Sequence, residues 1–302
     1  MKEEIIVDEE AVGTRVDAYI SNKSEKLSRS LVQNLIKEGK ILVDGNIPKL
    51  SQKVFKGQRI EIDYERETNE SIQAEDIAID IIYEDEDVIV VNKPKNMVVH
   101  PAVGNKSGTL VNAVLGKHEL SDISGDIRPG IVHRLDKNTT GVLVVAKNNY
   151  AHQKIAKQIQ DRETKKEYIA LVRGLIKEND GVINMPIGRH PTDRKKMAVT
   201  RTGKEAITEF KVLKRFEEGY TLISINLKTG RTHQIRVHMS HIGYPIVGDD
   251  VYSNGKNPFG ATSQMLHAQR LGFTHPTTEK WVEFEADLPK EFKDVIKTLH
   301  EI

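Results

Sequence analysis

The chain has 302 residues, 29% of them charged, with no cysteine and a formal net charge of +1. Without cysteine it can form no disulfide, no cysteine-zinc site and no thiol nucleophile, which excludes a zinc base deaminase and suits a reducing compartment. No stretch approaches the roughly 20 apolar residues that a membrane span needs, and the acidic N-terminus is unlike a signal peptide, so we expect a cytoplasmic protein.

The first predicted unit is a small basic αβ module over residues 13–63. Apolar residues at helical spacing predict two short helices, the second ending at Gly39, and short strands follow them. Residues 13–60 carry 10 Lys and Arg against 4 Asp and Glu. Arg29 and Lys37 fall on the solvent side of the second helix, where they could lie on a phosphate backbone. A generic capping domain is the alternative.

An acidic connector over residues 64–78 follows, without periodicity, and we expect it to let the module move. Residues 61–87 carry 1 Lys or Arg against 12 Asp and Glu, whereas residues 128–236 carry 23 against 11. Two basic blocks on either side of an acidic connector suit a polyanionic partner held by two modules. From charge alone, basic residues that merely solvate the surface explain the pattern as well.

A larger domain is predicted over residues 79–302, and its strands and helices do not alternate regularly. A mixed, largely antiparallel central sheet with flanking helices is therefore favoured over a doubly wound sheet, and the fold class is α+β. We expect strands at residues 79–83, 87–92, 168–172, 207–213 and 220–227, and helices at 109–115, 152–160 and 290–299.

Four runs of this domain contain residues suited to catalysis: VNKPKNMVVHP at 91–101, GIVHRLDKNTTGVLVVAK at 130–147, KKEYIALVRG at 165–174, and LKTGRTHQIRVHMSHIGYPIVGD at 227–249. Together they resemble the RluA/RluD-type pseudouridine synthase family, and the similarity continues through QMLHAQRLGFTHP. It covers essentially all of residues 80–290. The one notable departure is Asn96, where the family usually has glycine; asparagine tolerates the same left-handed backbone.

The N-terminal module resembles the RNA-binding domain first described in ribosomal protein S-four, in TRVDAYIS, SRSLVQNLIKEGKILVDG and VFKGQRIEI. The two resemblances together imply a cofactor-free enzyme with the pseudouridine synthase fold. It would isomerise uridine to pseudouridine in structured RNA, with large-subunit (23S) ribosomal RNA as the expected substrate.

Asp136, at the end of His133-Arg134-Leu135-Asp136, is the candidate catalytic carboxylate. The reaction breaks the bond from uracil N1 to ribose C1′ and rebuilds it from C5, so an ionised carboxylate must act near C1′ or C2′. A hydrolase would need a second acid, and residues 130–147 hold none. Local sequence alone favours a structural aspartate in a turn, and the resemblance reverses this preference. Covalent attack on the sugar and formation of a glycal both stay open.

The resemblance implies roles for further residues. Tyr168 matches a tyrosine that stacks on the target base, and Arg236 an arginine that pairs with the catalytic aspartate. Arg231 is the competing candidate for that role. Arg231 and Arg236 lie five residues apart on an expected helix or turn, so we expect only one of them to face the carboxylate. Arg134 matches an arginine that fills the gap left by the flipped uridine, with a phosphate contact as the alternative. Leu266 matches an apolar residue beside the base, and it could equally be an ordinary core leucine.

His133 and Lys93, within the quoted runs, are also expected to bind substrate, and the basic stretch from residue 189 to 204 to grip RNA phosphates. No metal is expected, since His233, His238 and His241 lack a zinc-protease spacing. No cofactor is expected either, since no glycine-rich nucleotide loop is present. We expect a monomer. The main rival is a non-catalytic RNA-binding or ribosome-assembly factor on the same scaffold; a uracil-excising glycosidase is disfavoured by the missing second acid.

Overall fold

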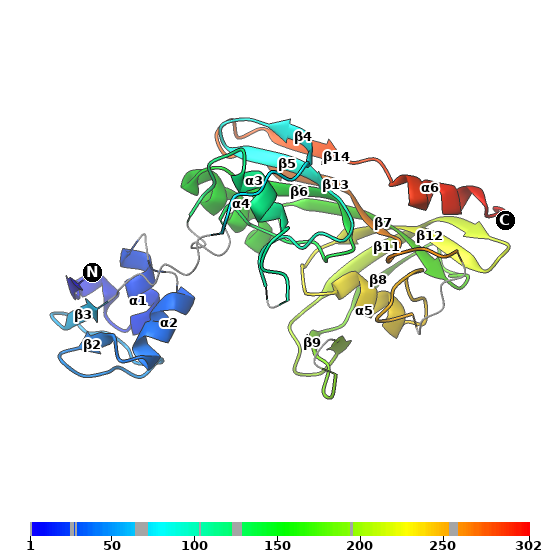
Figure 1. The fold of residues 1–302 in the computed structure, drawn as a ribbon. Helices are drawn as coiled ribbons and strands as arrows, with labels where there is room; N and C mark the ends of the chain where they lie inside the picture. The colour runs from blue at the N-terminus through cyan, green and yellow to red at the C-terminus, as the bar shows by residue number, and fades with distance from the viewer. Residues whose placement is uncertain are drawn as a thin grey trace. The chain divides into compact units, whose positions relative to one another are not determined.

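The computed structural model describes residues 2–24, 27, 29–63, 72–102, 104–122, 129–193, 196–253 and 259–302 (Figure 1). It divides into two compact units, one formed by Met1–Ser71 with Asp122–Pro129, and the other by Ile72–Ser121 with Gly130–Ile302. Among the described residues, no helix is long and apolar enough to cross a membrane.

The smaller unit packs two helices on an antiparallel sheet with strand order β1-β3-β2. Its apolar core includes Val16, Ile20 and Ile60, each fully buried. The two predicted helices are confirmed. The last strand starts at Arg59, after a turn at Gly57 with φ 81°. The elements are β1 (Lys2–Ile6), the 3-10 turn η1 (Glu9–Ala11), α1 (Val16–Lys23), α2 (Arg29–Lys37), β2 (Ile41–Val43) and β3 (Arg59–Asp63).

The larger unit is built on one mixed sheet of nine described strands, in the order β4-β5-β6-β13-β7-β12-β11-β8, with β14 paired to β13. Every described pairing is antiparallel except β6 with β13, so the α+β class with a largely antiparallel sheet is confirmed. The strands are β4 (Asp80–Glu84), β5 (Val88–Lys93), β6 (Thr140–Ala146), β7 (Lys165–Arg173), β8 (Asp180–Asn184), β11 (Ile207–Phe216), β12 (Tyr220–Leu227), β13 (Leu266–Thr274) and β14 (Trp281–Glu285).

Helices cover this sheet, and a separate hairpin stands beside it (Figure 1). Apolar residues of α4 pack on the face of β6 and β13, whereas α5 contacts β11 and the hairpin. The helices are α3 (Leu110–Leu115), α4 (Asn149–Asp161), α5 (Gln234–His241) and α6 (Lys290–Lys297); the hairpin strands are β9 (Ile187–Arg189) and β10 (Met197–Val199).

The parallel pair of β6 and β13 depends on Gly141. A Cβ atom there would lie 2.1 Å from the carbonyl oxygen of Ala268, and the residue has φ 114°. Only glycine allows this approach. Because the strands are parallel, their N-terminal ends meet at one edge of the sheet, which brings the loop before Thr140 beside the loop before Leu266.

The acidic connector is in part fixed to the larger unit. Its residues 64–71 lie outside the described residues. Beyond them, Asn112 of α3 donates a hydrogen bond to the Gln73 carbonyl at 2.7 Å and accepts one from the Glu75 amide at 2.9 Å. Ile77 packs against the core. This second half of the predicted connector therefore packs on the larger unit.

Candidate active site

Asp136 lies in the loop that enters β6, and its neighbours hold it there. Leu135 is buried in the core with 4% exposure, and the Thr139 amide donates to the Asp136 carbonyl at 3.1 Å. The side-chain amide of Gln264 donates to Thr139 Oγ1 at 3.2 Å, which connects this loop to the one before β13. The Asp136 side chain itself is 17% exposed. A well-fixed backbone thus presents a carboxylate that solvent and substrate can still reach.

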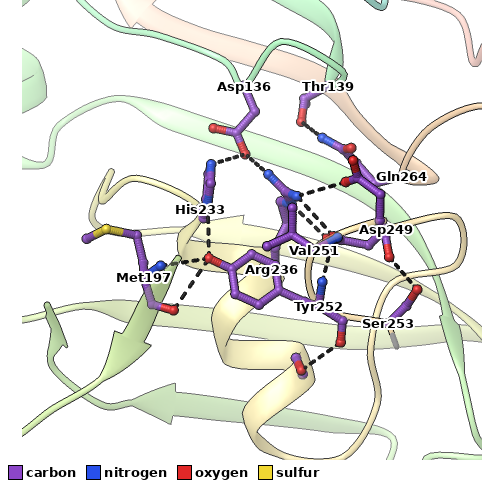
Figure 2. A network of polar contacts seen from close by, with 12 residues as sticks. Asp136, Thr139, Met197, His233, Arg236, Asp249, Val251, Tyr252, Ser253 and Gln264 are labelled. Atoms are coloured by element: carbon purple, nitrogen blue, oxygen red, sulfur yellow. Dashed lines mark hydrogen bonds and ion pairs between the residues drawn. The ribbon is translucent and has the colours of Figure 1, made fainter. Parts of the chain in front are cut away.

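Arg236 of α5 joins Asp136 to a second carboxylate (Figure 2). Its Nη1 donates to Asp136 Oδ2 at 3.0 Å, while Nε and Nη2 donate to the two oxygens of Asp249 at 2.7 and 2.9 Å. Burial alone would lower the pKa of Arg236, but its hydrogen bonds and charge interactions with both aspartates raise it above the ordinary value. The guanidinium therefore stays charged and has a fixed orientation.

Asp249 was not among the predicted site residues. It is fully buried, and its Oδ1 also accepts hydrogen bonds from the amides of Val251 and Tyr252 at 2.9 and 3.0 Å. A signal existed in the sequence, because Asp249 is the first acidic residue after Arg236 and a buried arginine needs an acidic partner. Because Asp249 lies in the turn that follows Gly248, it reads as an ordinary loop residue in the sequence.

Arg231 takes a different place from Arg236. Its Nε donates to the Glu205 carbonyl at 2.9 Å, and its amide donates to Gln234 Oε1 at 3.0 Å. Of the two competing arginines, the structure brings Arg236 to Asp136 and leaves Arg231 on the loop before α5.

His233 and Tyr252 flank this arrangement (Figure 2). His233 Nε2 lies 4.0 Å from Asp136 Oδ2, and its Nδ1 lies 2.9 Å from the Tyr252 hydroxyl, which accepts a hydrogen bond from the Met197 amide at 2.9 Å. The Arg236 guanidinium lies over the Tyr252 ring, 5.2 Å from its centroid. Burial lowers the pKa of His233, against the opposing effect of Asp136, so the imidazole is neutral near pH 7.

Tyr168 and Leu266 form an apolar wall in the same core cluster. Tyr168 of β7 is paired with Ala268, and Leu266 with Ala170, so the two side chains are diagonal neighbours on one face of the sheet. Burial, together with the negative charge of Asp136, raises the pKa of Tyr168 above its ordinary value. The phenol therefore stays neutral at physiological pH.

Lys93 and His133 both have backbone partners and a structural role. The fully buried Lys93 ammonium donates to three backbone carbonyls at 2.7, 2.9 and 3.1 Å, those of Pro94, Met97 and Lys137. The His133 Nε2 accepts a hydrogen bond from the Val144 amide at 3.1 Å, and burial lowers the pKa of His133 to about 3. Both side chains thus fix the segments on either side of Asp136. Asn96, in the loop that Lys93 holds, has φ 63°, the left-handed conformation expected for it.

Three residues predicted to contact RNA, Arg134, Lys37 and Arg29, are exposed, unlike the buried Lys93. Arg134 is exposed and makes no hydrogen bond or ion pair with a described residue. Lys37 is exposed on α2, while Arg29, 52% exposed, donates to the buried carboxylate of Asp17 at 3.1 Å. Burial alone would raise the pKa of Asp17, but hydrogen bonds from Arg15, Gln33 and Arg29 lower it strongly. Arg29 therefore has a structural partner as well as an exposed face.

The basic stretch from residue 189 to 204 includes part of the β9–β10 hairpin, but of its described basic residues only Arg189 lies in one of the two strands. Arg194 and Lys195 lie outside the described residues, and Lys196 is half-buried. Arg189, Arg201 and Lys204 are exposed.

The histidines in and beside α5 do not form a metal site. His238 is hydrogen-bonded to Thr208 and to the Met185 carbonyl, both at 2.9 Å. Within the described part of the chain, no group of three or more acidic or histidine residues could hold a metal ion.

Comparisons with known proteins show the family of this chain. Residues 87–241 match the family described as RNA pseudouridylate synthase, and residues 14–60 match the S4 domain. An uncharacterized RNA pseudouridine synthase, YlyB of Bacillus subtilis, is 45% identical over 98% of this chain and 97% of its own length. Ribosomal large subunit pseudouridine synthase D of Pseudomonas aeruginosa is 42% identical over 96% and 93%. The solved structure of human RNA Pseudouridylate Synthase Domain Containing 1 superposes with a TM-score of 0.60 at 28% identity, over 74% of this chain and 89% of that one.

Proposed function

The chain belongs to the RNA pseudouridylate synthase family, and we propose that it isomerises uridine in large-subunit ribosomal RNA, with Asp136 as the catalytic carboxylate. It is an RNA pseudouridine synthase, an isomerase. The ribosomal substrate is supported by the names of the relatives, such as the Pseudomonas aeruginosa enzyme. Because the proposed substrate is ribosomal RNA, we propose that the protein acts in the cytoplasm, and we propose that it does so as a monomer.

The observation that carries the proposal is the way Asp136 is held. Its Oδ2 receives the hydrogen bond from Arg236, whereas its Oδ1 has no hydrogen bond with a described residue, and we assign Oδ1 to the sugar. The charges of Asp136, Arg236 and Asp249 sum to minus one, so Asp136 is oriented without being neutralised. A carboxylate in this state can stabilise or attack the electron-poor C1′ as the glycosidic bond breaks.

The bond changes balance without any co-reactant. The N1–C1′ bond breaks, uracil leaves with the electron pair, and C5 then bonds to C1′; the proton lost from C5 equals the one gained at N1. The uracil anion must stay in place between these steps, and the apolar wall of Tyr168 and Leu266 would exclude water from it. Because its pKa is raised, Tyr168 would act there as a neutral stacking ring.

RNA binding is divided between two units in this proposal. We propose an S4-like module at residues 13–63 and a catalytic domain at 79–302, joined by the connector 64–78, whose second half packs on the larger unit. Arg29 and Lys37 of the module would contact RNA phosphates. Arg134, exposed two residues before Asp136, would occupy the stack vacated by the target uridine. Arg189, Arg201 and Lys204 would contact the backbone further from the reacting base.

The test is Asp136→Asn, which keeps the shape of the side chain and removes its charge. Pseudouridine formation in ribosomal RNA transcripts should fall more than about a hundredfold, because the neutral amide cannot act on C1′, while RNA affinity stays within a few fold. Asp161→Asn, an exposed carboxylate on α4, serves as the matched control. Residual turnover above about a hundredth of wild type would place the catalytic role elsewhere. Free uracil as the wild-type product would indicate a glycosidase, and binding without any product a non-catalytic RNA-binding factor.

A further inference from the structure

We propose that His233 is a positioning residue for Asp136, and that the Tyr252 hydroxyl fixes it in the tautomer whose proton is on Nε2. The inference rests on the proposed role of Asp136. His233 lies where the chain enters α5, with its side chain 21% exposed and its two ring nitrogens facing different partners. Nδ1 lies 2.9 Å from the Tyr252 hydroxyl, and Nε2 lies 4.0 Å from Asp136 Oδ2.

The hydrogen bonds of Tyr252 decide the tautomer. Its hydroxyl oxygen accepts from the Met197 amide at 2.9 Å, so its single proton goes either to His233 Nδ1 at 2.9 Å or to the Met197 carbonyl at 3.4 Å. The histidine nitrogen is nearer. With Nδ1 as acceptor, the ring proton must lie on Nε2. The opposite tautomer would point the Nε2 lone pair at the Asp136 carboxylate, which is electrostatically unfavourable.

Asp136 Oδ2 therefore faces two donors, Arg236 Nη1 at 3.0 Å and His233 Nε2 at 4.0 Å. The longer separation is not a hydrogen bond in the free enzyme, but catalytic contacts commonly tighten when substrate binds. The charged groups acting on His233 are Asp136, Arg236, Asp249 and Arg134, and the ring is neutral among them. It thus adds a donor without adding charge, which keeps Oδ2 occupied and leaves Oδ1 for the sugar.

A purely conformational role for His233 makes a different prediction. The residue has φ 56°, a left-handed backbone that asparagine and histidine adopt more readily than most residues. If His233 were there only for this backbone, Asn would replace it better than Gln. If the Nε2 donor matters, Gln should replace it better, because the Gln amide nitrogen reaches the position of Nε2 whereas that of Asn reaches only Nδ1. The two substitutions therefore separate the roles.

The experiment compares His233→Gln, His233→Asn and Tyr252→Phe, measuring kcat, RNA affinity and thermal stability. We expect Asn to lower kcat about tenfold or more, Gln to retain more activity than Asn despite its poorer fit to the backbone, and RNA affinity to stay within about twofold. Tyr252→Phe should lower kcat, because without the hydroxyl the tautomer of His233 is no longer fixed, while the aromatic ring stays beside Arg236. Tyr150→Phe, which removes the hydroxyl of an exposed tyrosine of α4, is the control and should match wild type.

Coupling between the two residues completes the test. In the Tyr252→Phe, His233→Asn double variant, the loss in kcat should be smaller than the product of the single losses, because both changes remove one interaction. Additive losses, an Asn variant more active than Gln, or wild-type kcat in Tyr252→Phe would each overturn the inference. These outcomes leave Asp136→Asn unaffected, so they are distinct from failure of the proposed function.

Discussion

The buried carboxylate of Asp249 allows a quantitative prediction for Asp249→Asn. The wild-type side chain is fully buried and accepts four hydrogen bonds, two from Arg236 and two from backbone amides. In the variant one oxygen becomes an amide that faces N–H donors, and Arg236, 6% exposed, loses its buried acidic partner and keeps Asp136 and the exposed Asp250. Breaking a buried ion pair on one side costs about 3–5 kcal/mol. For a unit of this size, Tm should fall by about 6–20 °C.

The control is Asp250→Asn, which removes the neighbouring carboxylate. That side chain is 76% exposed and lies 3.8 Å from Arg236, so its loss should change stability by less than about 0.5 kcal/mol. Calorimetry of both variants tests stability, and single-turnover assays below the lower Tm test activity. Asp249→Asn should also lose turnover, because Arg236 would then neutralise Asp136 alone. Equal melting temperatures for the two variants would refute the idea that Asp249 anchors the site.

Three further predictions concern other parts of the chain. Arg236→Met should lower kcat far more than RNA affinity, and Arg231→Met should not; equal losses of kcat would show that contact with Asp136 is irrelevant. Deletion of residues 1–71 should leave kcat at saturating RNA unchanged but reduce the slope of log affinity against log salt by roughly 0.7–0.9 per lost phosphate contact, whereas an unchanged slope would exclude RNA binding by the module. Burial, only partly offset by Asp136, lowers the pKa of Lys93 from 10.5 to about 7, so the folded chain binds fewer protons than the unfolded chain between these values. The free energy of unfolding in urea should therefore rise with pH across this window. If the Lys93→Met variant showed the same rise, other groups and not Lys93 would be its cause.

Sequence reasoning worked where the signal was local or carried by several motifs. Alternating and helical spacing gave the fold class and most long elements, and the motif runs pointed to Asp136, Tyr168 and Arg236, of which Asp136 and Arg236 are in direct contact. It could not choose between Arg231 and Arg236, because the choice depends on where α5 begins relative to the Asp136 loop. That relation is set by tertiary packing.

The residues that sequence reasoning placed poorly are those whose partners are backbone atoms. Lys93 was expected to bind substrate, but its ammonium is enclosed by carbonyls of two loops. No spacing rule predicts such a partner, since every residue carries a carbonyl. The contacts of the connector could not be predicted for the same reason, because residues 73 and 75 contact α3 through their backbone groups. Asp249 is different, because its partner is the side chain of Arg236. Its position in a turn nevertheless made it look like an ordinary loop residue.

The position of β13 in the sheet has a consequence for the order in which the protein is made and folded. This strand lies between β6 and β7, although it follows them in the chain by about a hundred residues; Thr140 and His267, which are hydrogen-bonded to each other, are 127 residues apart. Every charged residue of the site precedes β13, yet the Asp136 loop lacks its neighbour until that strand is inserted. Such long-range pairing folds slowly. We therefore expect a nascent chain emerging from the ribosome to be inactive until residue 274 has been released, even though all its proposed catalytic side chains are already synthesised.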